Sequence, residues 1–311
     1  MSQGGLLVVR GLSVAFKTQK GTVQAIDGID LDLNENETLA IVGESGCGKS
    51  VLGHAIMRLL DDIAVVRGSV RFREKEVYEM DTTALLNLRG GLISLVPQSP
   101  SSSFNPVITI GKQIEELIEK AGKEKGNGAR KRALEYLSLA GFSEPELIHK
   151  SYPHRLSGGM CERALIAMAL SVEPELVIAD EPTKGLDALS RKNILGLLHK
   201  LAKDASMIMI THDLKAAETC ERLAVMYSGE IVEEGPTGIV LNHPRHVYTK
   251  GLIDAQPSRG MTPIKGRHNL FSHNAEGCRF KERCDAASNE CNNHPMLSKV
   301  EDYRKVRCCH A

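Results

Sequence analysis

The chain has 311 residues, which is enough for one large domain or two modest ones. Its formal net charge is zero, whereas nucleic-acid-binding modules usually carry a strong basic excess, so we expect no nucleic-acid partner. No apolar run reaches the ~18 residues that span a bilayer, and the first residues lack the basic and apolar stretches of a secretory signal. These features predict a cytoplasmic protein.

The N-terminal residues predict a small antiparallel β-subdomain. Apolar and polar side chains alternate in residues 6–16 and 29–33, and residues 23–27 are a further strand candidate after a polar hairpin. Such alternation is typical of strands with one solvent-facing side. We expect these strands to precede an α/β core.

A glycine-rich loop follows the next predicted strand, residues 38–42, and precedes a helix-like run at residues 51–57. The loop, residues 43–50, fits G-x-x-x-x-G-K-[ST], and strand–loop–helix is the setting that this motif requires. Its glycines allow a tight turn whose N–H groups, with the helix N-terminus, cradle phosphate oxygens. Lys49 is predicted to reach the β- and γ-phosphates and Ser50 to bind Mg²⁺. The predicted nucleotide-binding residues here are Gly43, Glu44, Ser45, Gly46, Cys47, Gly48, Lys49, Ser50 and Val51.

The rest of residues 1–255 predicts an α/β core with an inserted helical subdomain at about residues 98–172. Residues 98–106 have the composition of a loop, and helix patterns follow them. Beyond the insertion, strands alternate with helices, as in βαβ units. The expected strands are 68–72, 92–96, 176–180, 206–211, 222–227 and 230–234, and the expected helices are 83–89, 110–120, 129–140, 156–170, 188–203 and 246–255.

Two acids end the apolar run at residues 176–180, which lacks alternation, as a central parallel strand does. Asp180 is placed to hold Mg²⁺, directly or through water. Glu181 is placed to polarise a water for attack on the γ-phosphate, as a general base does. An acid pair after a strand is weak evidence alone, since strand ends are often polar, but the upstream phosphate loop strengthens it.

A serine and two glycines lie at the start of the helix expected at residues 156–170. Ser157 is a residue type that caps helix N-termini, and a capped helix is the simplest interpretation. The sharper hypothesis is a second anion site at Ser157, Gly158 and Gly159, because helix N-terminal amides attract phosphate. One chain cannot easily place two such loops on one γ-phosphate. This hypothesis therefore implies a second ATPase chain.

Six short motifs together resemble those of nucleotide-binding subunits of ABC transporters, in the same order. They correspond to the Walker A, Q-loop, signature, Walker B, D-loop and H-loop motifs, at residues 43–50, Gln98, 156–160, 176–181, 185–187 and His212. The resemblance covers about residues 6–255 and implies an ABC-type P-loop NTPase core. Finer similarity to the dipeptide/oligopeptide/nickel import branch lies at residues 43–46, 104–106, 156–160, 178–183, 225–229 and 246–252.

The resemblance implies a two-chain mechanism, in which two nucleotide-binding domains close head to tail around two ATP. The Lys49 and Ser50 side of one chain then faces the Ser157 loop of the other. ATP bridging the interface drives closure and hydrolysis reopens it, so the pair is a bistable element biased by a ligand. The resemblance also implies three further roles.

Phe16 is implied to stack on adenine, which an aromatic side chain can do. Gln98 is implied to contribute to Mg²⁺ and the attacking water. His212 is implied to contact the γ-phosphate as a sensor, although a lone His after a strand is usually only a polar strand end. With Glu181 as the base, these residues complete the expected catalytic set.

The sequence departs from the family pattern just after the signature. Cys161 and Glu162 stand where the family usually has Arg and Gln, while Arg163 is as expected. The loop itself is intact, so we expect ATP turnover, but Glu162 puts contacts at this position in doubt. The D-loop also begins Lys184-Gly185 in place of the branch's commoner Thr-Ala, which leaves the interpretation unchanged.

Residues 256–311 are rich in Pro, Gly, Asn, Arg and Cys, and we expect a separate C-terminal extension there. Four of its thiolates, from Cys278, Cys284, Cys291 and Cys308, suffice for tetrahedral Zn²⁺ or an iron–sulfur cluster. Zinc ribbons usually show tight C-x₂₋₄-C pairs and none occurs here, so the spacing favours a cluster, though weakly. Residues 277–284 and 306–308 resemble the extension of peptide-transporter ATPases, some of which hold a [4Fe–4S] cluster. Cys309 is an alternative fourth ligand, and free cysteines in a disordered tail are the remaining alternative.

Taken together, the sequence predicts the ATP-hydrolysing subunit of an ABC importer at the cytoplasmic face of a membrane. Peptides are the expected substrate, and nickel or a metal chelate is the alternative. We expect two membrane permeases, a second ATPase subunit that is a paralogue, and indirectly a substrate-binding protein. A soluble ABC ATPase of DNA repair or translation usually carries a long coiled coil or two cassettes, and this chain has neither. A regulatory protein with a vestigial ATPase is disfavoured by the intact Lys49, Asp180, Glu181 and His212.

Overall fold

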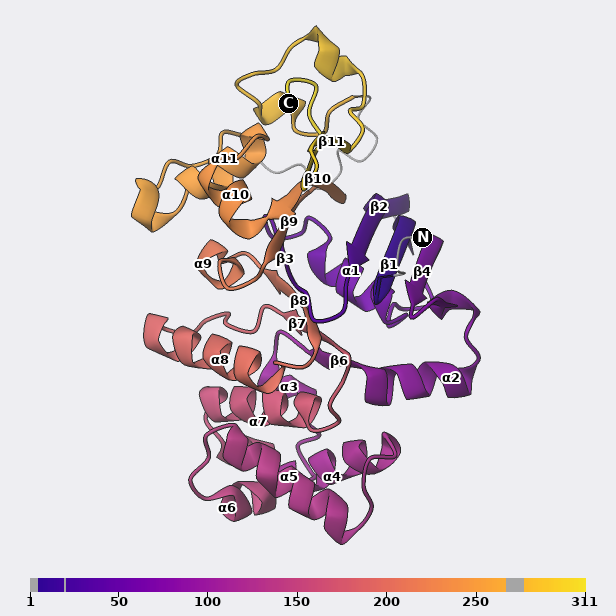
Figure 1. Cartoon of the computed structure of the whole chain (residues 1–311), viewed down its shortest axis with the longest axis vertical. Helices are drawn as coiled ribbons and strands as arrows, with labels where there is room; N and C mark the ends of the chain where they lie inside the picture. Colours follow the sequence, from indigo (N-terminus) through magenta and orange to yellow (C-terminus); the bar gives the residue numbers. More distant parts are fainter. Residues whose placement is uncertain (1–4, 20, 267–276) are drawn as a thin grey trace. The chain divides into compact units, whose positions relative to one another are not determined.

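The computed structural model describes residues 5–19, 21–266 and 277–311 (Figure 1). The chain divides into two compact units. The first comprises Met1–Asn34, Thr38–Tyr78 and Met209–Ala311, and the second comprises Glu35–Glu37 and Glu79–Ile208. In the parts of the chain that the structure describes, no helix is long and apolar enough to cross a membrane.

The antiparallel strands expected at the N-terminus form one four-stranded sheet in the first unit, in the order β2-β1-β4-β5. Its strands are β1 (Leu7–Thr18), β2 (Gly21–Leu33), β4 (Ala64–Phe72) and β5 (Lys75–Glu76). The two runs expected at residues 23–27 and 29–33 are one strand, because Gly28 takes a left-handed φ of 62° and its N–H donates to the Ser13 hydroxyl. The bulge lets the strand continue.

The first unit also contains the strands that pack behind the glycine-rich loop. Strand β3 (Thr38–Val42) pairs in parallel with β9 (Arg222–Tyr227), which pairs antiparallel with β10 (Glu230–Pro236). Helix α1 (Lys49–Ile56) follows the loop. Further elements of this unit are α9 (Leu214–Ala217), α10 (Thr237–Asn242), α11 (Val247–Asp254) and the 3₁₀ turns Pro257–Arg259, Lys281–Arg283 and Asn289–Asn292. Strand β8 (Ser206–Thr211) runs across the division between the units.

A C-terminal hairpin that the sequence did not predict joins this sheet. Strand β12 (Arg304–Val306) pairs with β10 and with β11 (Ser298–Glu301). The Arg304 side chain is 1% exposed and its guanidinium pairs with the fully buried Glu233 carboxylate. These two strands are too short and polar for an alternation of apolar and polar side chains to predict them. The buried ion pair between Arg304 and Glu233 holds the hairpin against the sheet. Residues 277–311 therefore pack with the first unit, and a domain boundary at residue 256 stays a prediction.

The second unit contains the parallel pair β6 (Ile93–Val96) and β7 (Leu176–Asp180). All five residues of β7 are buried, as its unbroken apolar run predicted. The helices of the second unit pack against one another, and α7 contacts both α5 and α8 (Figure 1). The helical elements are α2 (Thr82–Asn87), a π turn (Leu88–Leu92), α3 (Pro100–Ser103), α4 (Ile110–Lys120), α5 (Asn127–Leu139), α6 (Pro145–Lys150), a 3₁₀ turn (Pro153–Arg155), α7 (Gly158–Leu170) and α8 (Ala188–Leu201), and the 3₁₀ turn Val77–Glu79 spans the division.

Two short helices of this unit were not predicted. Helix α3 lies inside the expected loop at residues 98–106, and α6 follows α5. Both have proline at the first helical position, where its missing N–H has no role. A single turn is too short to show helical periodicity, so composition alone favoured a loop.

Candidate nucleotide site

The glycine-rich loop has the geometry that its motif requires. Gly46 and Gly48 take φ values of 83° and 105°, and Gly48 is the residue that precedes α1. A Cβ atom on Gly48 would lie 2.5 Å from the Ala25 carbonyl oxygen, and one on Gly43 would lie 2.1 Å from the Met226 carbonyl oxygen. Only glycine therefore fits at these positions, because the strands behind the loop approach its backbone closely.

Lys49 lies inside the loop. Its Nζ donates hydrogen bonds to the carbonyl oxygens of Gly43, at 2.8 Å, and Glu44, at 3.0 Å. Lys49 is only 6% exposed, so the loop wraps its ammonium group and presents a fixed positive charge. Cys47 is buried beside it, and burial raises the pKa of this thiol. The Cys47 side chain is therefore a small buried residue of the loop, and its predicted contribution to nucleotide binding stays a prediction.

The other predicted residues of the first unit lie on three elements. Ser50 and Val51 are half-buried in the first turn of α1, and Phe16 is half-buried on β1 opposite Val23 and Ala64. His212 is exposed directly after β8. Its turn is fixed by Asp213, whose N–H donates to the Thr211 hydroxyl and whose carboxylate caps α9.

In the second unit, Gln98, Asp180 and Glu181 all lie at the carboxyl ends of two neighbouring parallel strands. Strands β6 and β7 are parallel, with Val96 opposite Ala179, so both strands end at the same edge. Gln98 follows the first strand, Asp180 ends the second and Glu181 directly follows it. Both acids are buried, at 5% and 9% exposure. Glu181 has a left-handed φ of 51°, a strained conformation of the kind that clusters at functional sites.

The Ser157 loop is open to solvent. Ser157 caps α7, and its hydroxyl accepts a hydrogen bond of 3.3 Å from the Met160 N–H. Gly158 and Gly159 are exposed, and a Cβ on either would meet no atom within 4 Å. Beside them lies a cavity of about 520 Å³ between α7 and α8, lined in part by Ser157, Gly159, Met160, Arg163, Asn193 and Lys200. The structure confirms that Ser157 caps α7. The N-terminal end of this helix is exposed, so another molecule can reach its amide groups.

The two residues that depart from the family pattern are buried. Cys161 is 1% exposed and Glu162 6% exposed, both on α7. Burial raises the pKa of the Glu162 carboxyl to about 7. The carboxyl is therefore largely protonated below neutral pH and resembles the glutamine that the family usually has there.

We expect Glu162→Gln to stabilise the chain at pH 8 by up to about 3 kcal/mol, since one unit of pKa corresponds to ~1.4 kcal/mol. The folded pKa is raised above that of the unfolded chain, about 4.3. Stability is therefore lost as pH rises between these values, because the unfolded chain releases a proton that the folded chain keeps. Urea unfolding at pH 5 and pH 8 measures this, with Glu135→Gln, an exposed residue of α5, as the control. An equal pH dependence in Glu162→Gln and the original chain would contradict the expectation.

The cysteines of the C-terminal residues gather in one region. The Cys278 N–H donates to the Cys291 carbonyl oxygen at 2.9 Å. Burial raises the pKa of Cys278 to about 11, and the nearby thiols of Cys291, Cys308 and Cys284 add to the shift. Over residues 5–19, 21–266 and 277–311, however, no three His, Cys, Asp or Glu side chains are arranged to hold a metal ion. The thiols suit a soft metal or a cluster chemically, but the structure supports neither iron–sulfur nor zinc.

Two residues that sequence reasoning did not place at the loop contact Glu44. The Glu44 N–H donates to the Tyr248 hydroxyl at 2.9 Å, and the Glu44 carboxylate pairs with Arg283. Tyr248 and Arg283 are 204 and 239 residues away from Glu44 in the sequence, so no local sequence pattern predicts these contacts.

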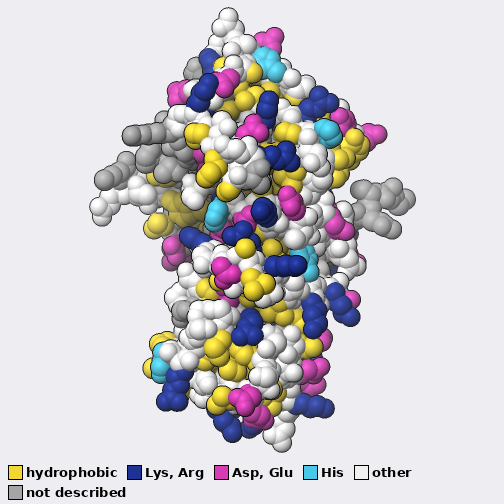
Figure 2. Space-filling view, turned by 90° about the vertical axis from the view of Figure 1, so that its left-hand side faces the viewer, with side chains coloured by type: hydrophobic (Ala, Val, Ile, Leu, Met, Phe, Trp, Pro, Cys, Tyr) yellow, Lys and Arg dark blue, Asp and Glu magenta, His cyan; other side chains and the backbone are white. Residues whose placement is uncertain are grey.

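The surface charge of the protein is mixed. Figure 2 shows basic and acidic side chains interspersed on one face, in keeping with the zero net charge.

Comparison with known proteins gives two family matches. The family described as "ABC transporter" matches residues 26–184, and "Oligopeptide/dipeptide transporter, C-terminal region" matches residues 232–291. Among curated proteins of Bacillus subtilis (strain 168), the chain is 39% identical to the oligopeptide transport ATP-binding protein AppD, covering 97% of this chain and 96% of AppD. It is 40% identical to the dipeptide transport ATP-binding protein DppD, covering 97% of this chain and 94% of DppD.

Solved structures give the same likeness. The ATP-binding cassette MJ0796, in a dimeric post-hydrolysis state bound to ADP and Pi, has a TM-score of 0.67 at 28% identity. The match covers 74% of this chain and 98% of that one. CbiO1 from Clostridium perfringens, part of the transporter complex cbiONQ, is similar in fold, with a TM-score of 0.65 and coverage of 83% and 97%.

Proposed function

The chain belongs to the ATP-binding subunits of ABC transporters, and we propose that it hydrolyses ATP to drive peptide import. The family matches and the relatives at about 40% identity confirm the resemblance drawn from the six motifs. One observation carries the peptide assignment: the similarity to oligopeptide and dipeptide transport proteins spans 97% of this chain, including its C-terminal residues.

The proposed reaction uses residues of both units and of a second chain. The wrapped Lys49 ammonium and the loop amides bind the β- and γ-phosphates. Ser50 and Asp180 hold Mg²⁺, which when bound neutralises charge developing on the phosphates. Glu181 accepts a proton from the attacking water, which Gln98 orients, and His212 contacts the γ-phosphate. Phe16 stacks on adenine.

The exposed Ser157 loop completes the nucleotide site of another chain. Its open glycines and capped helix end leave amide donors directed at solvent, which suits a phosphate brought by a partner. The dimeric state of the related MJ0796 cassette supports this arrangement. We infer that the partner is a paralogue, and that ATP binding closes the pair.

We further infer that the assembly lies at the cytoplasmic face of a membrane and includes two permeases and, indirectly, a substrate-binding protein. The loop and helices from residue 99 onward are the proposed permease contact. Cys278, Cys284, Cys291 and Cys308 are proposed to ligate a [4Fe–4S] cluster, with Zn²⁺ and Cys309 as the alternatives. This proposal rests on the resemblance of residues 277–284 and 306–308 to the extension of peptide-transporter ATPases and on the affinity of thiolates for such clusters. The iron and zinc content of anaerobically purified protein distinguishes the metals.

Uptake of a labelled tripeptide tests the proposed function directly. Deleting the chain from its own cell should abolish uptake, and the restored chain should recover it, because closure of the pair needs the nucleotide site and the Ser157 loop of this chain. A variant with Lys215→Ala, an exposed position on α9, serves as the matched control. Unchanged peptide uptake together with lost nickel uptake would overturn the peptide assignment and favour a metal importer.

A further inference from the structure

The segment that carries Cys278 and Cys284 contacts the glycine-rich loop through an ion pair. Arg283 donates from Nη1 and Nη2 to the two carboxylate oxygens of Glu44, at 2.7 and 3.0 Å. Its Nε donates to the Lys265 carbonyl oxygen at 2.9 Å. The Arg283 side chain is 6% exposed, so this two-pronged pair is held in one geometry and is stronger than a surface ion pair.

Aromatic packing holds the same segment in place. The Phe280 ring lies edge-on to Tyr227, with centroids 5.2 Å apart, and 5.4 Å from the Tyr248 ring. The Arg283 guanidinium lies 5.7 Å from the centroids of both Tyr227 and Phe280. Because the Tyr248 hydroxyl accepts from the Glu44 N–H, this cluster contacts both the backbone and the side chain of Glu44.

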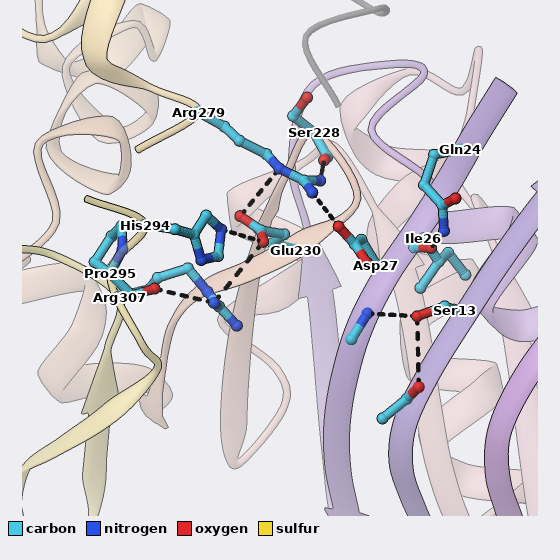
Figure 3. A network of polar contacts seen from close by, with 12 residues as sticks. Ser13, Gln24, Ile26, Asp27, Ser228, Glu230, Arg279, His294, Pro295 and Arg307 are labelled. Atoms are coloured by element: carbon cyan, nitrogen blue, oxygen red, sulfur yellow. Dashed lines mark hydrogen bonds and ion pairs between the residues drawn. The ribbon is translucent and has the colours of Figure 1, made fainter. Parts of the chain in front are cut away.

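A second arginine of the segment, Arg279, lies in a network of polar contacts with Asp27, Ser228 and Glu230 (Figure 3). Arg279 pairs with Asp27 and Glu230 and donates to the Ser228 carbonyl oxygen. The next residue, Gly229, donates its N–H to the Cys47 carbonyl oxygen at 2.9 Å. The buried Glu230 carboxylate is further held by His294, at 2.7 Å. The turn that carries Gly229 is therefore fixed between the loop and the C-terminal segment.

We propose that Arg283 is a positioning residue for nucleotide binding, acting through Glu44, so that ATP affinity depends on the docking of the Cys278–Cys284 segment. Among the residues that the structure describes, Glu44 is the one predicted nucleotide-binding residue with which Arg283 forms a hydrogen bond or ion pair, and this pair fixes the first turn of the loop that wraps Lys49. Coupling between two sites is reciprocal. Bound nucleotide should therefore hold the segment in its docked position. The inference rests on the proposed nucleotide binding and is independent of the transported substrate.

Equilibrium binding of a fluorescent ATP analogue with Mg²⁺ to the full chain tests the proposal. Arg283→Gln should weaken binding about 5- to 150-fold, the usual range of coupling between sites. Arg283→Lys should recover part of the loss, because it keeps the charge but not the two-pronged geometry. Lys265→Gln is the matched control, since Lys265 forms an exposed pair with Asp285 in the same segment and does not contact Glu44 through its side chain.

A double-mutant cycle and hydrogen exchange separate positioning from general structure. Glu44→Gln and Arg283→Gln should weaken binding non-additively, because each removes the same pair. ATP should slow amide exchange in residues 277–284 of the original chain and not in Arg283→Gln. Wild-type affinity in Arg283→Gln, or additive losses, would overturn the proposal. If Arg283→Gln fails to fold, wild-type affinity in Glu44→Gln overturns it instead. Absence of ATP binding by the original chain would count against the proposed function itself.

Discussion

Glu181→Gln should abolish ATP turnover while leaving ATP binding intact. The change removes the carboxylate that accepts a proton from the attacking water, and such general-base catalysis contributes about 10²–10⁴-fold to rate. The amide keeps the size and shape of the side chain at a buried position with a left-handed backbone. Steady-state phosphate release and equilibrium binding of ATP, measured on the same preparation, check both parts of the expectation.

The control for this variant lies at the other end of the same strand. Glu175 directly precedes β7, whereas Glu181 directly follows it. Glu175→Gln removes one carboxylate from this strand region without touching the predicted catalytic edge, so turnover should stay near the original rate. Turnover that survives Glu181→Gln would remove Glu181 as the base.

Lys49→Ala should abolish measurable nucleotide binding at concentrations that saturate the original chain. The ammonium forms charge-assisted hydrogen bonds, which are worth about 1.5–3 kcal/mol each, and ~1.4 kcal/mol is a tenfold change in affinity. Losing two such contacts to phosphate therefore predicts a loss of roughly 100-fold or more. The measurement is equilibrium ATP binding with Mg²⁺.

A structural loss must be separated from the loss of phosphate contacts in this variant. Lys49 also holds the carbonyl oxygens of Gly43 and Glu44, so its removal loosens the ligand-free loop. Thermal unfolding without nucleotide reports that effect. Lys215→Ala, at an exposed position, should bind ATP as the original chain does. Full affinity in a folded Lys49→Ala variant would contradict the assigned role of the loop.

The glycine-rich loop was predictable because its chemistry is local. Positive φ at Gly46 and Gly48 and close backbone contacts at Gly43 are requirements that a short motif can carry. The buried strand β7 was predictable from its unbroken apolar run, and the cap of α7 from Ser157. In each case the residues that set the structure lie within a few positions of one another.

The surroundings of the loop were not predictable, because they depend on distant residues. The Arg283–Glu44 pair joins positions 239 residues apart, and neither residue type is unusual in its own stretch. The hairpin of β11 and β12 depends on the buried Arg304–Glu233 pair, which short polar strands do not reveal. Long-range ion pairs of this kind fix the C-terminal residues, where hydrophobic periodicity is weak.

ATP hydrolysis by the complete importer, reconstituted in lipid vesicles with its permeases and binding protein, tests the central claim most directly. The account predicts that peptide-loaded binding protein stimulates hydrolysis, and that Glu181→Gln eliminates the part of the basal and stimulated rates that comes from this chain's own nucleotide site. Hydrolysis that is indifferent to peptide, or whose rates are unchanged by Glu181→Gln, would contradict it.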